Sequence, residues 1–200
     1  AVVAGGPPPT APAIASASPD RPAGVEADRQ RISAAMLAAI DREAPGLRWV
    51  PGPERNRNIA DWTGPTVDTP SWPVNQFSHL SASGWIGFGV AARGDVRAWL
   101  SIEISTPKPG QPAETFTCFE SARACETSRG PNGERIRYLD LNAWYAPPGQ
   151  RPTPLADRSV EVIRPDGTRV SVQASSSSTQ FLLTVAEMTG IGLDQALALH

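Results

Sequence analysis

The clearest alternation of apolar and other residues along the chain runs from residue 96 to residue 105. Its even positions are all apolar: Val96, Ala98, Leu100, Ile102 and Ile104. Its odd positions carry Arg97, Trp99, Ser101, Glu103 and Ser105. Successive side chains of a strand point to opposite faces of a sheet, so this pattern predicts a strand with one buried face. We expect the even face to lie beneath a covering helix.

A second alternating run, Trp85–Val90, precedes this strand, and a turn between them predicts a hairpin. We expect its apolar even positions to share the buried face: Ile86, Phe88 and Val90. Residues that face each other across a hairpin lie on the same face of the sheet. This register therefore requires a loop with an odd number of residues, such as Arg93–Asp95. A two-residue Gly94–Asp95 turn would instead place the glycines of the first run opposite Leu100 and Ile102 of the second. That register would require a bulge.

The last hairpin, Ser159–Val172, contains the turn Pro165–Gly167. Proline pre-sets the first turn angle, and glycine takes the left-handed position of a three-residue loop. The resulting register pairs Val162 with Val170 and Val160 with Val172. Turn chemistry and alternation therefore both predict one buried face that carries four valines.

Helices are predicted at both ends of this set of strands. Residues 25–43 carry an apolar stripe of Ile32, Met36 and Ile40, and Pro45 ends the helix. Near the C-terminus, Thr184 and Glu187 have the spacing of a capping box. We expect the short helix that follows to be interrupted at Gly190 and Gly192.

The order of elements predicts an α+β fold. We expect an antiparallel sheet of about five to six strands, packed by the N-terminal helix and by the short C-terminal helix. Residues 25–200 should form a single domain. Residues 1–24 are rich in alanine and proline and should be a disordered linker. It resembles the spacer that follows an apolar anchor segment, and the alternative is a linker between domains.

Tryptophans are concentrated around a long proline-rich segment. The four indoles are Trp49, Trp62, Trp72 and Trp85. Aromatic faces beside asparagine, aspartate and arginine indicate a candidate ligand-binding surface. The alternative is that the indoles pin a long loop onto the sheet.

One carboxylate is a further candidate for binding or catalysis. In the predicted strand 134–145, Ile136 and Tyr138 lie on one face, but Leu139 and Leu141 lie on the other. This switch indicates a bulge, or a strand that is covered on both sides. Asp140 lies at the switch, where a side chain is easily redirected towards a site.

The two cysteines, Cys118 and Cys125, are seven positions apart. An exported protein would join them as a disulfide, and a cytosolic one would keep two thiols. A zinc site needs about four ligands, and the only histidines are His79 and His200. We therefore expect a structural disulfide, with no metal and no cofactor.

Charge and motifs exclude several classes of protein. The formal net charge is −2 and the isoelectric point about 5.7, which argues against nucleic acid and against a polybasic membrane surface. No apolar run approaches the length of a membrane span. The sequence contains no G-x-S-x-G motif to accompany His79, and a G-x-G-x-x-A match at 87–92 lies in the predicted hairpin, where no helix follows. We therefore predict no catalytic residues.

Two segments carry a resemblance to a family. The hairpin Val160–Val172 and the segment Leu183–Met188, together with the close cysteine pair, resemble uncharacterised exported, membrane-anchored proteins of Streptomyces-like actinobacteria. The likeness covers roughly residues 29–200. It implies an extracellular or cell-surface location behind an N-terminal anchor, and it implies no activity for particular residues.

Three classes of function remain open. The first is a non-enzymatic binding or sensory domain for a cell-envelope ligand or protein partner. The second is an envelope hydrolase that uses carboxylates such as Asp140, Glu103 or Asp61, which would have to lie about 5–10 Å apart in a cleft. The third is a structural or regulatory ectodomain that contacts only protein partners.

Overall fold

The computed structural model describes residues 23–51, 66–70, 72–78, 82–107, 109–110 and 116–198. Nearly all of the predicted linker 1–24, together with Asp61, Trp62 and His79, lies outside these residues. The described elements follow one another as α1 (Ala23–Glu43), β1 (Arg48–Val50), β2 (Val74–Ser78), β3 (Ala82–Arg93), β4 (Val96–Pro107), β5 (Ala124–Arg129), β6 (Arg135–Tyr145), β7 (Thr153–Ile163), β8 (Arg169–Ser176), α2 (Val185–Leu193) and a 3₁₀ turn, Gln195–Leu197.

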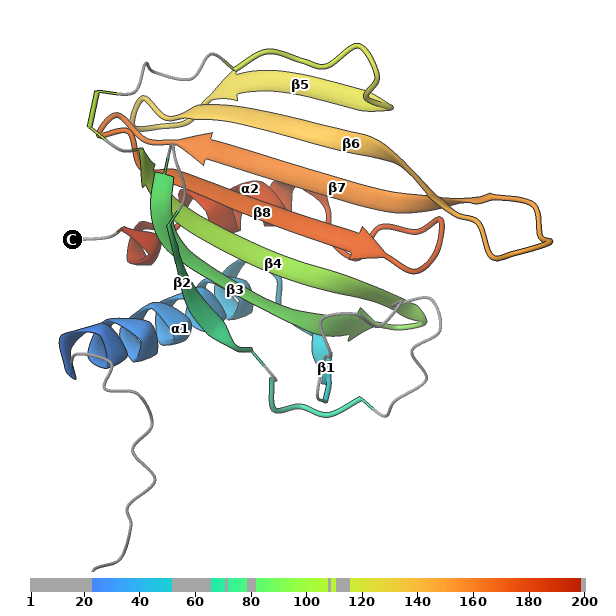
Figure 1. Ribbon diagram of the computed structural model, residues 1–200, viewed down its shortest axis with the longest axis horizontal. Helices are drawn as coiled ribbons and strands as arrows, with labels where there is room; N and C mark the ends of the chain where they lie inside the picture. The colour runs from blue at the N-terminus through green and yellow to red at the C-terminus, as the bar shows by residue number, and fades with distance from the viewer. Residues whose placement is uncertain are drawn as a thin grey trace, which may run out of the picture.

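The strands form one antiparallel sheet in the order β1-β3-β4-β8-β7-β6-β5, and β2 also pairs with β3 (Figure 1). Both helices pack on the same face of this sheet. The α+β prediction is confirmed, but the described sheet has eight strands rather than five to six. Strands β2 and β5 have no regular alternation of apolar and polar residues, so the sequence pattern does not reveal them.

The face beneath the helices contains the main hydrophobic core. Four of the predicted even residues of β4 are buried there against valines of β7 and β8, namely Ala98, Leu100, Ile102 and Ile104, and Val96 is partly buried. From α1, the stripe of Ile32, Met36 and Ile40 packs on the same cluster, and Met188 and Ile191 reach it from α2. We call the opposite face of the sheet, which carries neither helix, the open face.

The final hairpin has the predicted register. Val162 pairs with Val170 and Val160 with Val172, and all four side chains are fully buried. Gly167 has a φ of 89°, the left-handed conformation that its position in the loop requires. The Asp166 carboxylate accepts a hydrogen bond from the Thr168 amide at 2.8 Å, which holds the turn closed.

The predicted register of the central hairpin is wrong. Arg93 pairs with Val96, so the loop is the two-residue Gly94–Asp95 turn, and the pairing continues without a bulge to Ala82 and Pro107. The even residues of β3 therefore point to the open face. There Phe88 stacks on Trp99 with 5.1 Å between ring centroids, and Val90 packs in a separate small cluster with Val50.

A glycine explains why the odd-numbered residues of β3, rather than the even-numbered ones, point to the helix face. Gly87 faces Met36 of α1 and the indole of Trp72, and a Cβ built on it would lie 2.7 Å from the Met36 sulfur and 2.4 Å from the Trp72 Nε1. A larger residue here would push α1 away from the sheet. The pattern of large apolar residues therefore indicated the wrong face, because the buried face of β3 depends on a residue without a side chain.

The predicted capping box of α2 is confirmed. The Thr184 hydroxyl accepts from the Glu187 amide at 3.1 Å, and the Glu187 carboxylate accepts from the Thr184 amide at 2.9 Å. The predicted interruption at the glycines is wrong, since α2 continues through both. A Cβ on Gly192 would lie 2.7 Å from a methyl group of Val162, so this glycine lets the helix approach the sheet closely.

Candidate functional site

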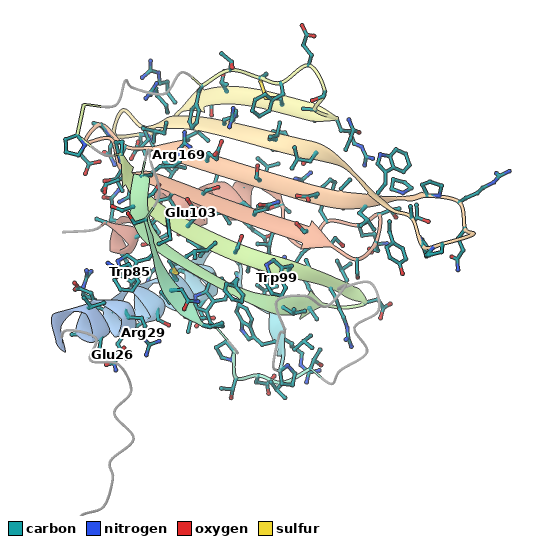
Figure 2. The ribbon with its side chains drawn as sticks, in the orientation of Figure 1. Glu26, Arg29, Trp85, Trp99, Glu103 and Arg169 are labelled. Carbon is teal, nitrogen blue, oxygen red and sulfur yellow. A yellow bond between two sulfur atoms is a disulfide. The ribbon has the colours of Figure 1, made fainter. Side chains whose placement is uncertain are left out.

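The open face between β4 and β6 is mostly polar. Strand alternation places there Trp99, Ser101, Glu103, Arg169, Ser171, Gln173, Asp157, Ser159, Glu161, Arg135 and Arg137. Figure 2 labels Trp99, Glu103 and Arg169 along this side of the sheet. A polar sheet face that carries no helix is a candidate binding surface, and its charges decide what it can bind.

The segment Phe116–Phe119 lies against the arginines of this face. The Arg137 guanidinium lies 5.0 Å from the ring centroid of Phe116 and 4.7 Å from that of Phe119. Its Nη1 donates to the Thr117 carbonyl at 2.9 Å, and its Nη2 is paired with the Glu161 carboxylate. Arg137 is itself buried, so it fixes this segment to β6.

A disulfide fixes the same segment to β5. Cys118 and Cys125 are bonded, with 5.6 Å between their Cα atoms, as the sequence predicted. Cys125 pairs with Leu139 of β6, so the bond lies on the open face. The segment is therefore held at two points, by a covalent bond and by Arg137.

We expect that replacing both cysteines, as Cys118→Ser with Cys125→Ser, lowers the free energy of unfolding by about 2–3 kcal/mol. The reason is that the disulfide closes a loop of about eight residues in the unfolded chain. Urea unfolding followed by circular dichroism measures the change, and the natural chain in reducing buffer is the control. Equal unfolding midpoints for the oxidised chain and the double variant would contradict this expectation.

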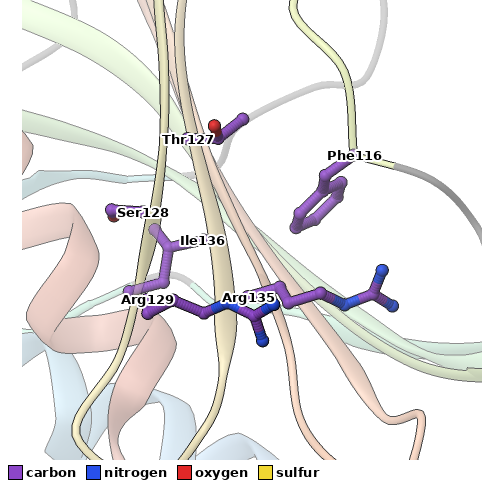
Figure 3. Close-up of a pocket in the computed structure, with 6 residues that line it drawn as sticks. All are labelled: Phe116, Thr127, Ser128, Arg129, Arg135 and Ile136. Carbon is purple, nitrogen blue, oxygen red and sulfur yellow. The ribbon is translucent and has the colours of Figure 1, made fainter.

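A pocket opens between Phe116 and the β5–β6 hairpin (Figure 3). Its volume is about 290 Å³, and its lining residues are Phe116, Thr127, Ser128, Arg129, Arg135 and Ile136. Arg135 extends on the Phe116 side of the sheet, with its guanidinium carbon 5.8 Å from the ring centroid. None of the lining residues among those described is acidic. Strand pairing puts Thr127, Arg129 and Arg135 on the Phe116 side of the sheet, whereas Ser128 and Ile136 point to the helix face, so the Phe116 side combines positive charge, one hydroxyl group and a phenyl ring.

Three of the four candidate tryptophans are described, and all three lie within the core rather than on this surface. The exposed fractions are 4% for Trp49 and 7% each for Trp72 and Trp85. Trp49 and Trp72 meet edge to face, 5.4 Å between centroids. This burial agrees with the alternative that the indoles anchor the chain to the sheet. Trp62, the fourth indole, lies outside the described residues.

Asp140 lies on the helix face, in a buried polar network. It is 5% exposed and accepts hydrogen bonds from Tyr138 Oη at 2.6 Å, Arg158 Nε at 2.8 Å and Arg158 Nη2 at 3.1 Å. Arg158 also donates to the Leu183 carbonyl at 3.1 Å, which ties the chain before α2 to the sheet. The register of β6 is unbroken, so the strand is not bulged, and it has a buried apolar residue on each face, Ile136 and Leu139.

The network has consistent protonation states. Burial raises the pKa of the Tyr138 phenol, and the neighbouring carboxylate raises it further, so Tyr138 remains a donor. Burial alone would lower the pKa of Arg158, but its hydrogen bonds and the charge of Asp140 raise it overall. Each group thus holds the others in place, and Asp140 has a structural role.

The two described carboxylates that were named for hydrolysis, Asp140 and Glu103, are not brought together. Asp140 and Glu103 lie on opposite faces of the sheet, and Asp61 is outside the described residues. Glu103 does share the open face with Glu161, two strands away, which corresponds to about 10 Å between Cα atoms. Glu161 is paired with Arg137, and the pocket lies beyond it at β5 and β6.

Sequence reasoning did not identify Phe116, Arg129 or Arg135 as site residues. Arg135 and Arg137 alternate along one strand and therefore share a face, which is a signal that the sequence contains. The position of Phe116 depends on a chain reversal and on which strands pair. Only the structure shows these two features.

No family model, curated protein or solved structure matches the chain. In the described part of the chain, neither helix is long and apolar enough to cross a bilayer. The same residues contain no cluster of three or more metal-ligating side chains. The geometry of the open face is therefore the basis on which function is inferred.

Proposed function

We propose that the chain is a non-enzymatic binding module of the cell envelope, tethered outside the cytoplasm behind a membrane anchor. The observation that supports it best is the pocket between Phe116 and the β5–β6 hairpin. One wall of this pocket is fixed covalently by the disulfide, so the site is formed before a ligand arrives. A preformed pocket with a few convergent polar groups is typical of a small-ligand site.

Two further observations support the location. A structural disulfide persists in oxidising compartments, and the alanine- and proline-rich residues 1–24 have the composition of a spacer after an anchor. Protease added to intact cells should therefore digest the protein while a cytoplasmic marker protein stays whole. Resistance until the cells are lysed would contradict this location.

The ligand site is tested by NMR titration of the ¹⁵N-labelled chain with soluble peptidoglycan fragments. We expect amide shifts to cluster at Phe116, Thr127–Arg129 and Arg135–Ile136, and Phe116→Ala to weaken binding. Trp144→Ala is the matched control, since this aromatic residue is 57% exposed near the end of β6 opposite the pocket. An absence of shifts, or shifts confined to other residues, would contradict the proposal.

A further inference from the structure

Three arginines surround one phenyl ring on the open face. The guanidinium carbons of Arg135, Arg137 and Arg169 lie 5.8, 5.0 and 5.7 Å from the Phe116 ring centroid. They come from β6 and β8, with β7 between those strands. Like charges this close repel one another, so the fold concentrates positive charge at this point.

Among the residues that the structure describes, acidic side chains only partly neutralise this group. Glu161 of β7 pairs with Arg137 and lies 3.8 Å from Arg169. With Arg129 included, four arginines and this glutamate give a formal charge of +3, and counting Glu103 from the same face leaves +2. The whole chain has a charge of −2, so the pocket region is opposite in sign to the protein.

The arginines divide into two roles. Arg137 is buried, and its two terminal nitrogens contact Thr117 and Glu161, so it holds the wall of the pocket. Arg129 and Arg135 line the cavity itself, on the same face of the sheet as the hydroxyl group of Thr127. A guanidinium presents its N–H groups as a planar fork that matches the oxygens of a carboxylate or phosphate.

We infer that the pocket binds a small ligand that carries a carboxylate or phosphate group, held by Arg129 and Arg135 with its apolar body against Phe116. This inference rests on the proposed binding function and specifies the ligand class. A cavity of about 290 Å³ admits only a small ligand or one group of a larger one. The hydroxyl group of Thr127, on the same face of the sheet, would donate a further hydrogen bond to the anion.

The test uses three aromatic probes of similar size in NMR titrations of the full chain: benzoate, phenyl phosphate and uncharged benzamide. We expect the two anions to bind with dissociation constants on the order of millimolar, and benzamide to bind at least tenfold more weakly. Tighter binding of benzoate would indicate a carboxylate ligand, and tighter binding of phenyl phosphate a phosphate ligand. Added sodium chloride should weaken both anions.

Variants test the role of the arginines. Arg135→Gln should weaken both anions by about tenfold or more, because a charged hydrogen-bond pair is lost. Arg135→Lys keeps the charge without the fork, so it should show a smaller loss. Arg151→Gln is the matched control, since this exposed arginine lies in the β6–β7 loop at the other end of the hairpin and should not affect binding.

The outcomes separate the two proposals. Equal binding of benzamide and the anions, or anion binding that is unchanged in Arg135→Gln, would overturn the anionic ligand class. If peptidoglycan fragments still shift the pocket amides, the binding function stands without that class. If neither the fragments nor the anions cause shifts at the pocket, both proposals are overturned.

Discussion

Replacing Asp140 with alanine is expected to lower the free energy of unfolding by about 3–5 kcal/mol, because it leaves a buried guanidinium without its counter-ion. The two side chains are only 13% exposed for Arg158 and 7% for Asp140. The change also removes the acceptor of the Tyr138 hydroxyl at 2.6 Å. Urea unfolding at neutral pH, with both circular dichroism and tryptophan fluorescence as probes, measures the loss.

A triple variant is the control for this expectation. Tyr138→Phe, Asp140→Leu and Arg158→Met together remove the whole polar network and replace it with apolar groups of similar size. This variant should be considerably more stable than Asp140→Ala, since no unpaired charge stays buried. If the triple variant is as unstable as the single one, the unpaired charge is not the cause.

Leu100→Ala is expected to cost about 2–5 kcal/mol, because it opens a cavity under the helices in the centre of the sheet. The Leu100 side chain is fully buried between Gly89 of β3 and Ala174 of β8, whose small side groups cannot fill the space. The measurement is again urea unfolding. An unfolding free energy within 1 kcal/mol of the natural chain would contradict the placement of the core.

Ser101→Ala is the matched control for Leu100→Ala. The two residues are adjacent in β4 and point to opposite faces of the sheet. Ser101 is partly exposed on the open face, and its replacement should change stability by no more than about 0.5 kcal/mol. The contrast between the two variants tests the alternation on which the fold prediction depends.

The sequence predicts a structure well where two independent signals agree. In the last hairpin, the Pro165–Gly167 turn and the alternation of valines both specify one register, and that register is observed. The capping box at Thr184 and the stripe on α1 are likewise local patterns. Each depends on residues that are close in the chain, where propensity and spacing carry most of the information.

The failed register of the central hairpin concerns contacts between distant segments. The alternation of β3 leaves open which of its two faces packs beneath the helices. The face that contains Gly87 does so, because Met36 and Trp72 pack against this glycine. The burial of Trp49, Trp72 and Trp85 likewise depends on separate segments that meet in the core. The pocket depends on a segment that folds back from β5 towards arginines of β6 and β8. The composition of the chain contains no information about these contacts between distant segments.

The placement of the disulfide has a consequence for self-association of the protein. A sheet edge has unpaired backbone groups on which a strand of another copy can assemble, and this is a common start of aggregation. Strand β5 forms one such edge, but it is short and carries Glu126 and Arg129, and the chain leading into it turns back beside it (Figure 1). The Cys118–Cys125 disulfide keeps that turn beside the edge of β5, so it helps to prevent aggregation through this edge.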